Sequence, residues 1–351
     1  MTDNSNTTAE IVLPAPDFGA ELGFWTKRGF RLDAIWPADD PEVARLSGHG
    51  MNLRLDRTAT TPATLRMTAG EAATSPAGSR ILIGPAVPDY AMPEIQTGFG
   101  LRRLSDGASW VIGRAGMHYR DLVPDRLGGA IIASHIRIPD GGPVPDMVHY
   151  HTVGFQLIFC YKGWVDLVYE DQGPPFRLEA GCCVIQPPEI RHRVLFASDN
   201  IEVIEIGVPA VHVTTIDHDM QLPNDRVDPD RRFQSQRFVH HRAEDAVWAP
   251  ARQAGFQSRD TSIAENTGDV AGVRVLRVDG PTAPFAHDAD IHFTFVMAGT
   301  MTLEVPDGRH DLNPSDAFVL PPDTPATYAD ASPDLELLEV TLPGSPRFTP
   351  R

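Results

Sequence analysis

The chain has 351 residues, of which 42% are hydrophobic, and it carries a formal net charge of −17. No uncharged apolar run approaches the roughly 18 residues that a membrane helix needs, so we expect a soluble globular protein that does not bind membranes. The acidic balance, without a concentrated stripe of Lys and Arg, argues against nucleic acid as a partner.

The length exceeds that of a usual single core, and 29 Gly and 32 Pro among many short apolar runs predict two or three mainly β units. Residues 1–8 have neither the basic start nor the apolar core of a secretory signal. The three cysteines, Cys160, Cys182 and Cys183, are odd in number and lie in one segment, which indicates reduced thiols rather than a disulfide framework. We therefore expect a cytoplasmic protein.

Residues 1–57 are predicted to form a small N-terminal module of order βαβββ. Apolar periodicity places its elements at residues 11–13, 18–27, 31–36, 43–46 and 51–56. With a Pro-Asp turn before Phe18 and the pair Phe24-Trp25, this stretch resembles one module of the glyoxalase/bleomycin-resistance (vicinal oxygen chelate) family, which normally pairs two modules around a metal. No second module is evident before residue 100. We interpret the half-module as vestigial and Glu10, at a ligand position of that family, as an exposed edge residue.

The rest of the chain divides into two strand-rich regions. Residues 58–80 contain many Thr and Ala and few large apolar groups, as expected of a linker. Short alternating strands dominate residues 81–215 and again residues 271–346. The intervening residues 216–270 are rich in Asp, Arg and Pro and are expected to form a polar crossing segment. Two β-barrels or sandwiches fit this pattern best.

Histidines in the first strand-rich region have the spacing of metal ligands. His149 and His151 are two residues apart, so on a strand their side chains project from one face. Gln156 follows them, and His192 would join them if its strand lay opposite in the same barrel. Three neutral imidazoles would then converge on one ion and leave coordination positions open for a substrate.

The same segment resembles the cupin family. Its two motifs are matched by His149, His151, Gln156 and Gly163, and then by Gly181, Pro187 and His192. Gln156 takes the place that Glu usually holds. The resemblance implies a double-stranded β-helix (jelly-roll) barrel with a metal ion held by the three histidines and Gln156. The alternative is a barrel without metal, whose histidines are only buried and hydrogen-bonded.

Gln156 matters because its amide is neutral. A set of three His and one Gln leaves the whole +2 charge on a divalent ion, so it should favour an anionic oxygen chelator as substrate. Alternatively, Gln156 does not bind the ion but orients a metal-bound water, which leaves a site of three His.

Counting by two from Gln156 puts Ile158 and Cys160 on the same inward face, which makes them candidate pocket residues. Cys160 has no evident base, so it is more simply a buried small residue than a nucleophile. The other histidines of this half, including His118 and His212, have no ligand spacing and are interpreted as surface or hydrogen-bonded core residues.

The second strand-rich region repeats the first motif in register as Phe285, His287, His292 and Gly299. Phe285 replaces the first His, and Thr327 occupies the position that matches His192. The repeat predicts an internal duplication with a degenerate second barrel that holds no metal, because two imidazoles alone rarely hold a divalent ion. A weak second site with Asp288 or Asp290 is the alternative.

Together these patterns predict a mainly β metalloenzyme of two cupin barrels behind the βαβββ module. We expect one divalent ion, with Fe(II) favoured over Zn, Mn or Ni, and activation of dioxygen against a small, anionic oxygen-chelating substrate. Two other functions stay open: a non-redox isomerase, lyase or decarboxylase, and a small-molecule-binding or sensor protein. A homodimer is an open alternative for the assembly.

Overall fold

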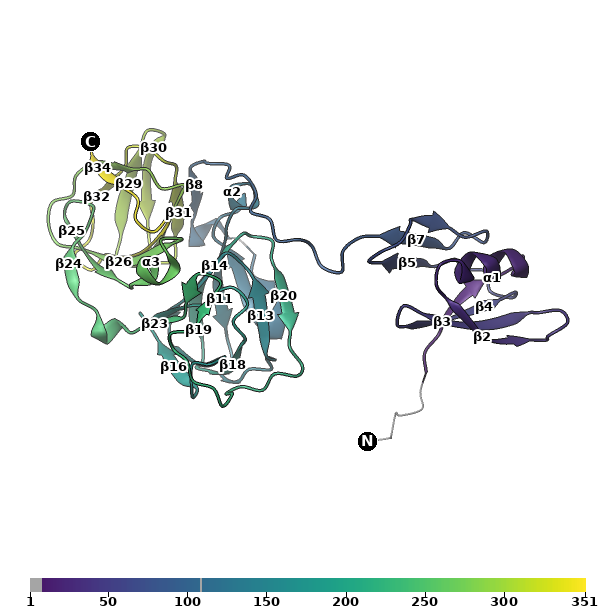
Figure 1. The fold of residues 1–351 in the computed structure, drawn as a ribbon. Coiled ribbons are helices and arrows are strands. Elements are labelled where there is room, and N and C mark those ends of the chain that lie inside the picture. Colours follow the sequence, from purple (N-terminus) through teal and green to yellow (C-terminus); the bar gives the residue numbers. More distant parts are fainter. Residues whose placement is uncertain (1–7, 108) are drawn as a thin grey trace. The chain divides into compact units, whose positions relative to one another are not determined.

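The computed structural model describes residues 8–107 and 109–351. The chain divides into two compact units, one ending at Asp89 and the other spanning Tyr90–Arg351, and each is described by itself. Strands predominate in both units (Figure 1). Among the described residues, no helix is both long enough and apolar enough to span a bilayer.

The first unit begins with the predicted βαβββ order. Its elements are β1 (Ile11–Pro14), α1 (Phe18–Thr26), β2 (Arg31–Trp36), β3 (Val43–Gly48) and β4 (Met51–Asp56). The strands form one sheet in the order β1-β4-β3-β2, with β1 parallel to β4. Asp17 caps α1 by accepting a hydrogen bond from the Ala20 amide, and Trp25 of α1 is completely buried. Glu10, interpreted above as an exposed edge residue, precedes the edge strand β1 but is half-buried, because its carboxylate is ion-paired with Arg45.

The linker predicted for residues 58–80 instead contains regular structure. It holds β5 (Thr64–Met67), β6 (Ala73–Thr74) and the first residue of β7 (Arg80–Ile83), which form the sheet β5-β7-β6. Leu65 and Ile81 are buried in the same core as Trp25. Glu21 of α1 accepts hydrogen bonds from the Trp25 indole and the Ala77 amide, so α1 anchors this segment. The Thr- and Ala-rich composition concealed these short strands because few large apolar side chains mark them.

The first barrel, called barrel 1, has two facing sheets. Its larger sheet has the order β23-β17-β14-β19-β11-β10-β9. These strands are β9 (Val111–Ile112), β10 (His118–Asp121), β11 (Ile132–Ile138), β14 (Phe155–Lys162), β17 (Cys183–Ile185), β19 (Ile201–Val208) and β23 (Val239–His241). Its smaller sheet has the order β16-β15-β18-β13-β20, with β12 beside β18. These strands are β12 (Gly142–Pro143), β13 (His149–Thr152), β15 (Trp164–Tyr169), β16 (Phe176–Glu179), β18 (His192–Ala197) and β20 (Val213–Ile216).

The second barrel, called barrel 2, repeats this plan. Its larger sheet has the order β24-β25-β26-β33-β28-β31-β8, and two smaller sheets complete it. The strands of the larger sheet are β8 (Gly100–Arg102), β24 (Trp248–Pro250), β25 (Phe256–Asp260), β26 (Gly272–Val278), β28 (Ile291–Ala298), β31 (Ala317–Leu320) and β33 (Glu336–Leu342). The smaller sheets use β27 (Phe285–His287), β29 (Met301–Val305), β30 (Gly308–Leu312), β32 (Thr327–Ala329) and β34 (Phe348–Pro350). The polar crossing segment predicted for residues 216–270 therefore already contains β24 and β25 of barrel 2.

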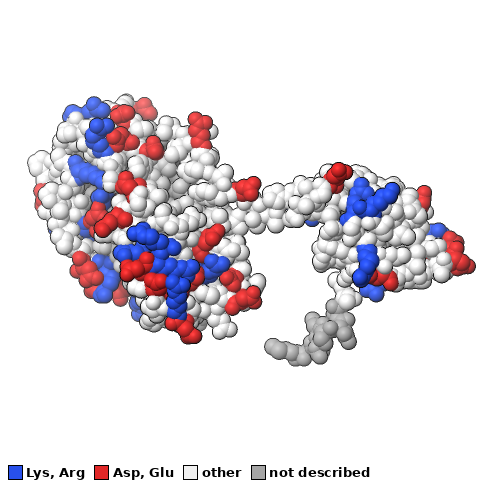
Figure 2. Space-filling view, viewed as in Figure 1, with Lys and Arg blue, Asp and Glu red and all other residues white. Residues whose placement is uncertain are grey.

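Short elements connect the barrels and cover their ends. They are η1 (Leu104–Asp106), η2 (Arg114–Gly116), α2 (Arg126–Gly129), β21 (Arg232–Phe233), β22 (Gln236–Arg237), η3 (Ala243–Asp245) and α3 (Ile263–Thr267). Lys and Arg side chains lie among Asp and Glu side chains on the face of residues 90–351 that Figure 2 shows.

The two barrels pack with their larger sheets against each other. One buried cluster joins Phe155 and Phe159 of β14 to Phe293 and Phe295 of β28. Each barrel also lends one strand to the other: β8 pairs with β31 of barrel 2, and β23 pairs with β17 of barrel 1 (Figure 1). The barrels therefore form one unit with a shared core.

The register of the strands reveals the internal duplication. In barrel 1, Gln156 of β14 lies opposite Gly207 of β19, two residues from Glu205. In barrel 2, His292 of β28 lies opposite Thr341 of β33, two residues from Glu339. The predicted repeat of the cupin motif thus extends to strand pairing.

Candidate metal centre

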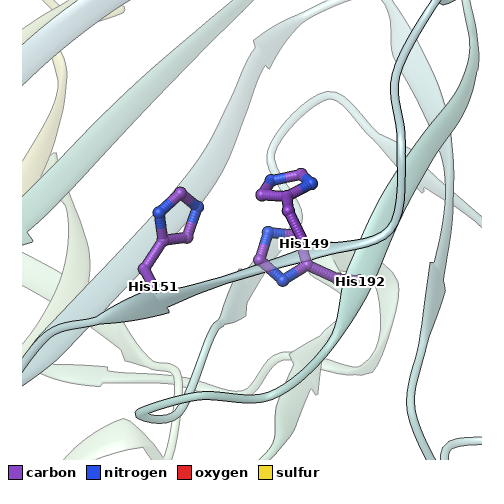
Figure 3. Close-up of side chains that lie close together, drawn as sticks. All are labelled: His149, His151 and His192. Carbon is purple, nitrogen blue, oxygen red and sulfur yellow. The ribbon is translucent and has the colours of Figure 1, made fainter. Parts of the chain in front are cut away.

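Three histidines of barrel 1 converge inside the barrel. His149 and His151 lie on β13, and His192 begins β18, directly opposite His149 in the sheet. Potential ligand atoms of the three side chains lie within 4.8 Å of one another, and all three residues are buried (Figure 3). The strand spacing predicted that His149 and His151 share a face, and the pairing of β13 with β18 adds the third imidazole.

Hydrogen bonds fix the orientation of each ring. Nδ1 of His149 lies 2.7 Å from the carbonyl oxygen of Met147, and Nδ1 of His192 lies 2.9 Å from that of Ile190. A carbonyl oxygen only accepts, so both rings donate from Nδ1 and keep a lone pair on Nε2. Nδ1 of His151 lies 2.8 Å from the hydroxyl oxygen of Thr214. Each imidazole is thus held through Nδ1, as metal-binding histidines commonly are, and Nε2 of His149 is buried without a partner.

Burial keeps these imidazoles neutral. It lowers the pKa of His149, and the nearby Arg114 guanidinium lowers it further. It lowers the pKa of His151 to about 2 and that of His192 well below the usual range, with the neighbouring imidazoles adding to both effects. The neutral ring is the form that binds metal, so the site needs to release few protons on loading.

Gln156 is completely buried on β14. Its amide nitrogen donates to Oε1 of Glu205 at 2.6 Å, and its amide oxygen Oε1 has no hydrogen-bond partner. Burial raises the pKa of Glu205, while the hydrogen bond from Gln156 opposes that rise. The pair therefore leaves a neutral oxygen donor free on Gln156.

The three imidazoles line a cavity of about 360 Å³. Its other residues with polar side chains are Arg114, Tyr119, Ser134, Gln186, Glu205, His212 and Thr214, and Gln156 is not among the described residues that line it. The sequence analysis missed Glu205 and Arg114 and interpreted His212 as a surface or core residue. In the structure the His212 ring lies 5.5 Å from that of His151, centroid to centroid. In the sequence, Glu205 stands out only as a carboxylate within the largely apolar segment of β19. Only the strand register shows that it lies near Gln156.

The two candidate pocket residues differ in position. Ile158 lines the cavity, whereas Cys160 is not among the described residues that line it. The Cys160 thiol is completely buried, 3.4 Å from the carbonyl oxygen of Gly163, and burial raises its pKa to about 12. Such a thiol is unreactive at neutral pH. Cys182 and Cys183 are also buried free thiols.

Barrel 2 lacks a comparable cluster. Nε2 of His292 lies 3.0 Å from Oε2 of Glu339, and both side chains are buried. The His287 ring lies 4.4 Å from that of His292, centroid to centroid, but Asp288 is exposed and paired with Arg347. Among the described residues, only the barrel 1 triad brings three potential His, Cys, Asp or Glu ligands together. The weak second site with Asp288 or Asp290, both of which are exposed, is therefore not formed by the residues that the structure describes.

Known proteins match this chain in fold only. No protein-family model and no curated protein matches the sequence. Salicylate 1,2-dioxygenase from Pseudaminobacter salicylatoxidans aligns with a TM-score of 0.55 and 16% identity, covering 74% of this chain and 90% of that chain. The oxalate decarboxylase formate complex of Lactobacillus farciminis aligns with a TM-score of 0.55 and 11% identity, covering 75% of this chain and 90% of that chain.

These likenesses confirm the predicted fold of two cupin barrels. At such identities they concern the fold and carry no activity over to this chain. The resemblance of the N-terminal module to the glyoxalase family stays a prediction.

Proposed function

We propose that this chain is a metal-dependent enzyme of the dioxygenase type, with one divalent ion held by His149, His151 and His192. The observation that carries the proposal is the orientation of the three rings, which are buried, neutral and hydrogen-bonded through Nδ1. Such an arrangement would be costly as plain core packing, because Nε2 of His149 is buried without a partner.

The donor set suits a divalent ion of intermediate softness. Imidazoles bind Fe, Zn, Ni and Cu, and Gln156 would offer Oε1 as a neutral fourth donor while Glu205 holds its amide nitrogen. The absence of a charged donor in this set favours an anionic oxygen chelator as substrate. We favour Fe(II), with Zn, Mn and Ni as alternatives for the same donors. Bound there, Fe(II) would supply Lewis acidity toward the substrate and activate dioxygen.

Other residues of the cavity would bind and orient the substrate. His212 donates from Nδ1 to the Pro209 carbonyl at 3.0 Å, which leaves Nε2 to accept a hydrogen bond from a substrate hydroxyl. Arg114 lines the same cavity and, although ion-paired with Asp146, has five N–H donors of which some are free for a substrate carboxylate or enolate.

Neighbours of the same fold support two reaction types. The salicylate 1,2-dioxygenase structure has been determined with gentisate, a hydroxylated aromatic acid, which favours the dioxygenase proposal. The oxalate decarboxylase structure contains formate, and the likeness to it favours a non-redox decarboxylase as the second candidate. Both reactions use an anionic substrate with oxygen donors, as the neutral donor set suggests.

Metal analysis and oxygen uptake test the proposal. Protein purified without added metal should contain close to one divalent ion per chain, and His149→Ala should lose it. His218→Ala serves as the matched control, because His218 is exposed and lies outside the cavity. The metal-loaded protein should consume oxygen with one member of a panel of catechols, hydroxybenzoates, diketones and thiols. Turnover without oxygen consumption would establish the non-redox candidate instead, and metal retained by His149→Ala would refute the site.

A further inference from the structure

The cavity of barrel 1 changes in chemistry along the barrel axis. The lining pairs of β11 and β19 are, in order along the strands, Ser134 with Glu205, Ile136 with Val203 and Ile138 with Ile201. One polar pair is thus followed by two apolar pairs.

The smaller sheet shows the same gradient. His149 lies opposite His192 on β18, and two residues further along β18 Val194 lies opposite Leu167. Both Val194 and Leu167 line the cavity. Imidazoles are therefore followed by branched aliphatic side chains, as on the larger sheet.

The two polar ends coincide. The His212 ring lies 5.5 Å from that of His151, centroid to centroid, and it also lies beside Gly207, two residues from Glu205 on β19. The metal ligands of one sheet and the polar pair of the other therefore face the same end of the cavity. The aliphatic pairs of both sheets face the other end, whereas Ile132 and Ile158 lie near the polar pair.

The aliphatic pairs of the larger sheet, Ile136 with Val203 and Ile138 with Ile201, offer no charged or hydrogen-bonding side chain to a ligand. Among the described residues that line the cavity, Arg114 and Glu205 are the only ones of the types Lys, Arg, Asp and Glu. Arg114 is ion-paired with Asp146, and Glu205 accepts a hydrogen bond from Gln156. A charged or strongly polar group placed against the pair Ile138 and Ile201 would lose its hydration without gaining a partner from that pair.

We propose that the substrate of this site joins its oxygen-chelating head to an uncharged hydrocarbon body that lies along the aliphatic half of the cavity. The inference rests on the proposed function, since the metal centre fixes the head. A volume of about 360 Å³ is near the lower end for small-molecule pockets and suits one compact molecule of this kind. Doubly charged small acids without a hydrocarbon body are poor ligands of this cavity.

Alkylhydroxamates test the proposal, because a hydroxamate chelates a divalent ion through two oxygens and its chain can be lengthened at will. Equilibrium binding to the zinc-loaded full chain is measured for acetohydroxamate, butyrohydroxamate, hexanohydroxamate and octanohydroxamate. Each added methylene that enters the apolar half should tighten binding about fourfold, until the cavity is full. Zinc avoids oxygen chemistry, so the readout is affinity alone.

Two near-isosteric variants sharpen the test. Val203→Thr places a hydroxyl on the aliphatic wall, and a bound alkyl chain would strip that hydroxyl of water. Octanohydroxamate should bind this variant about fivefold more weakly or worse, with acetohydroxamate unchanged. Val305→Thr is the control, since Val305 is partly buried on β29 of barrel 2, away from the cavity.

The outcomes separate the two claims. The proposal is supported if the protein binds zinc and acetohydroxamate and if the longer hydroxamates bind more tightly. Zinc and acetohydroxamate binding with flat or falling affinity along the series overturns the hydrocarbon body and leaves the metal centre intact. Failure to bind zinc overturns both.

Discussion

The two barrels hold their histidines with different partners. Backbone carbonyls hold Nδ1 of His149 and His192, which leaves Nε2 for a ligand. A carboxylate, that of Glu339, instead binds Nε2 of His292. Because Glu339 occupies the strand position of Glu205, the same carboxylate of the repeat contacts an amide in one barrel and an imidazole in the other. At this strand position barrel 1 thus has an amide whose oxygen is unpaired, and barrel 2 has an imidazole whose Nε2 is already bound.

Gln156→Glu should change both stability and metal binding. The substitution removes the donor to Glu205 and sets two carboxyl groups side by side, so unfolding of the metal-free protein at pH 7 should become easier by about 1–3 kcal/mol. An added carboxylate should also tighten binding of a divalent ion and weaken binding of an anionic chelator. Urea unfolding and metal competition measure these effects, with the exposed Gln234→Glu as control. Unchanged metal and chelator affinities would refute the argument for a neutral fourth donor.

His287 should make barrel 2 sensitive to acid. Burial, and next the His292 imidazole, lower the pKa of His287 to about 3, although Glu339 and Asp288 oppose this. The unfolded chain binds a proton there below about pH 6.5, whereas the folded protein does not. Stability is therefore fully present above about pH 6.5 and falls as the pH drops toward 3, by about 1.4 kcal/mol per pH unit for this group.

His287→Asn should flatten that dependence. Asn does not titrate, and its side-chain oxygen can accept the hydrogen bond that the Ala289 amide gives to Nδ1 of His287. Urea unfolding at several pH values between about 4 and 6 should give a slope shallower by about 1.4 kcal/mol per pH unit. His218→Asn, at an exposed position, should leave the slope unchanged. Parallel curves for His287→Asn and the parent would contradict the assignment.

At the scale of elements, both barrels use the same tight turn after the first motif. Gly163 has φ +73° and precedes Trp164, whose amide donates to the Ser198 hydroxyl. Gly299 has φ +69° and precedes Thr300, whose amide donates to the Ser332 hydroxyl. Both barrels use the same turn with a positive φ, a backbone conformation that favours glycine in each copy.

Gly299→Ala should destabilise the protein more than Gly163→Ala. A Cβ at position 299 would lie 2.6 Å from the backbone of Leu335, which cannot move aside as a side chain can. A Cβ at position 163 mainly meets the Ser198 side chain. We expect losses of about 1–2 kcal/mol for Gly163→Ala and about 3 kcal/mol or more for Gly299→Ala, measured by urea unfolding. Gly280→Ala, with no atom within 4 Å of the added Cβ, is the control. Equal losses at both turns would contradict this.

The sequence predicted local features better than distant contacts. The spacing of His149, His151 and His192 identified the triad because strand alternation and motif spacing are local properties. Glu205 and His212 escaped detection because their approach to the site depends on which strands pair and in what register. β5 and β6 escaped because they are short and their apolar side chains are few.

At the scale of the molecule, the shared core makes the two barrels dependent on each other. The cluster around Phe159 and Phe295 belongs to both larger sheets, and β8 and β23 each complete the sheet of the other barrel. A barrel that has lost its ligands can therefore persist as the packing partner of the barrel that kept them. The N-terminal unit differs, because its buried cluster around Trp25 draws on residues of that unit alone.

Two truncations should distinguish these relations. A fragment of residues 90–351 keeps every buried cluster of both barrels, so it should fold and bind one metal ion per chain with the affinity of the full protein. A fragment of residues 90–241 keeps the metal ligands and β23 but exposes Phe155, Phe159 and their neighbours, and it leaves β8 without β31. That fragment should aggregate or lose the cooperative unfolding transition. Metal analysis, light scattering and thermal unfolding measure both. Loss of metal binding by residues 90–351 would show that the N-terminal unit supports the site, and a stable monomer of residues 90–241 would show that barrel 2 does not support barrel 1.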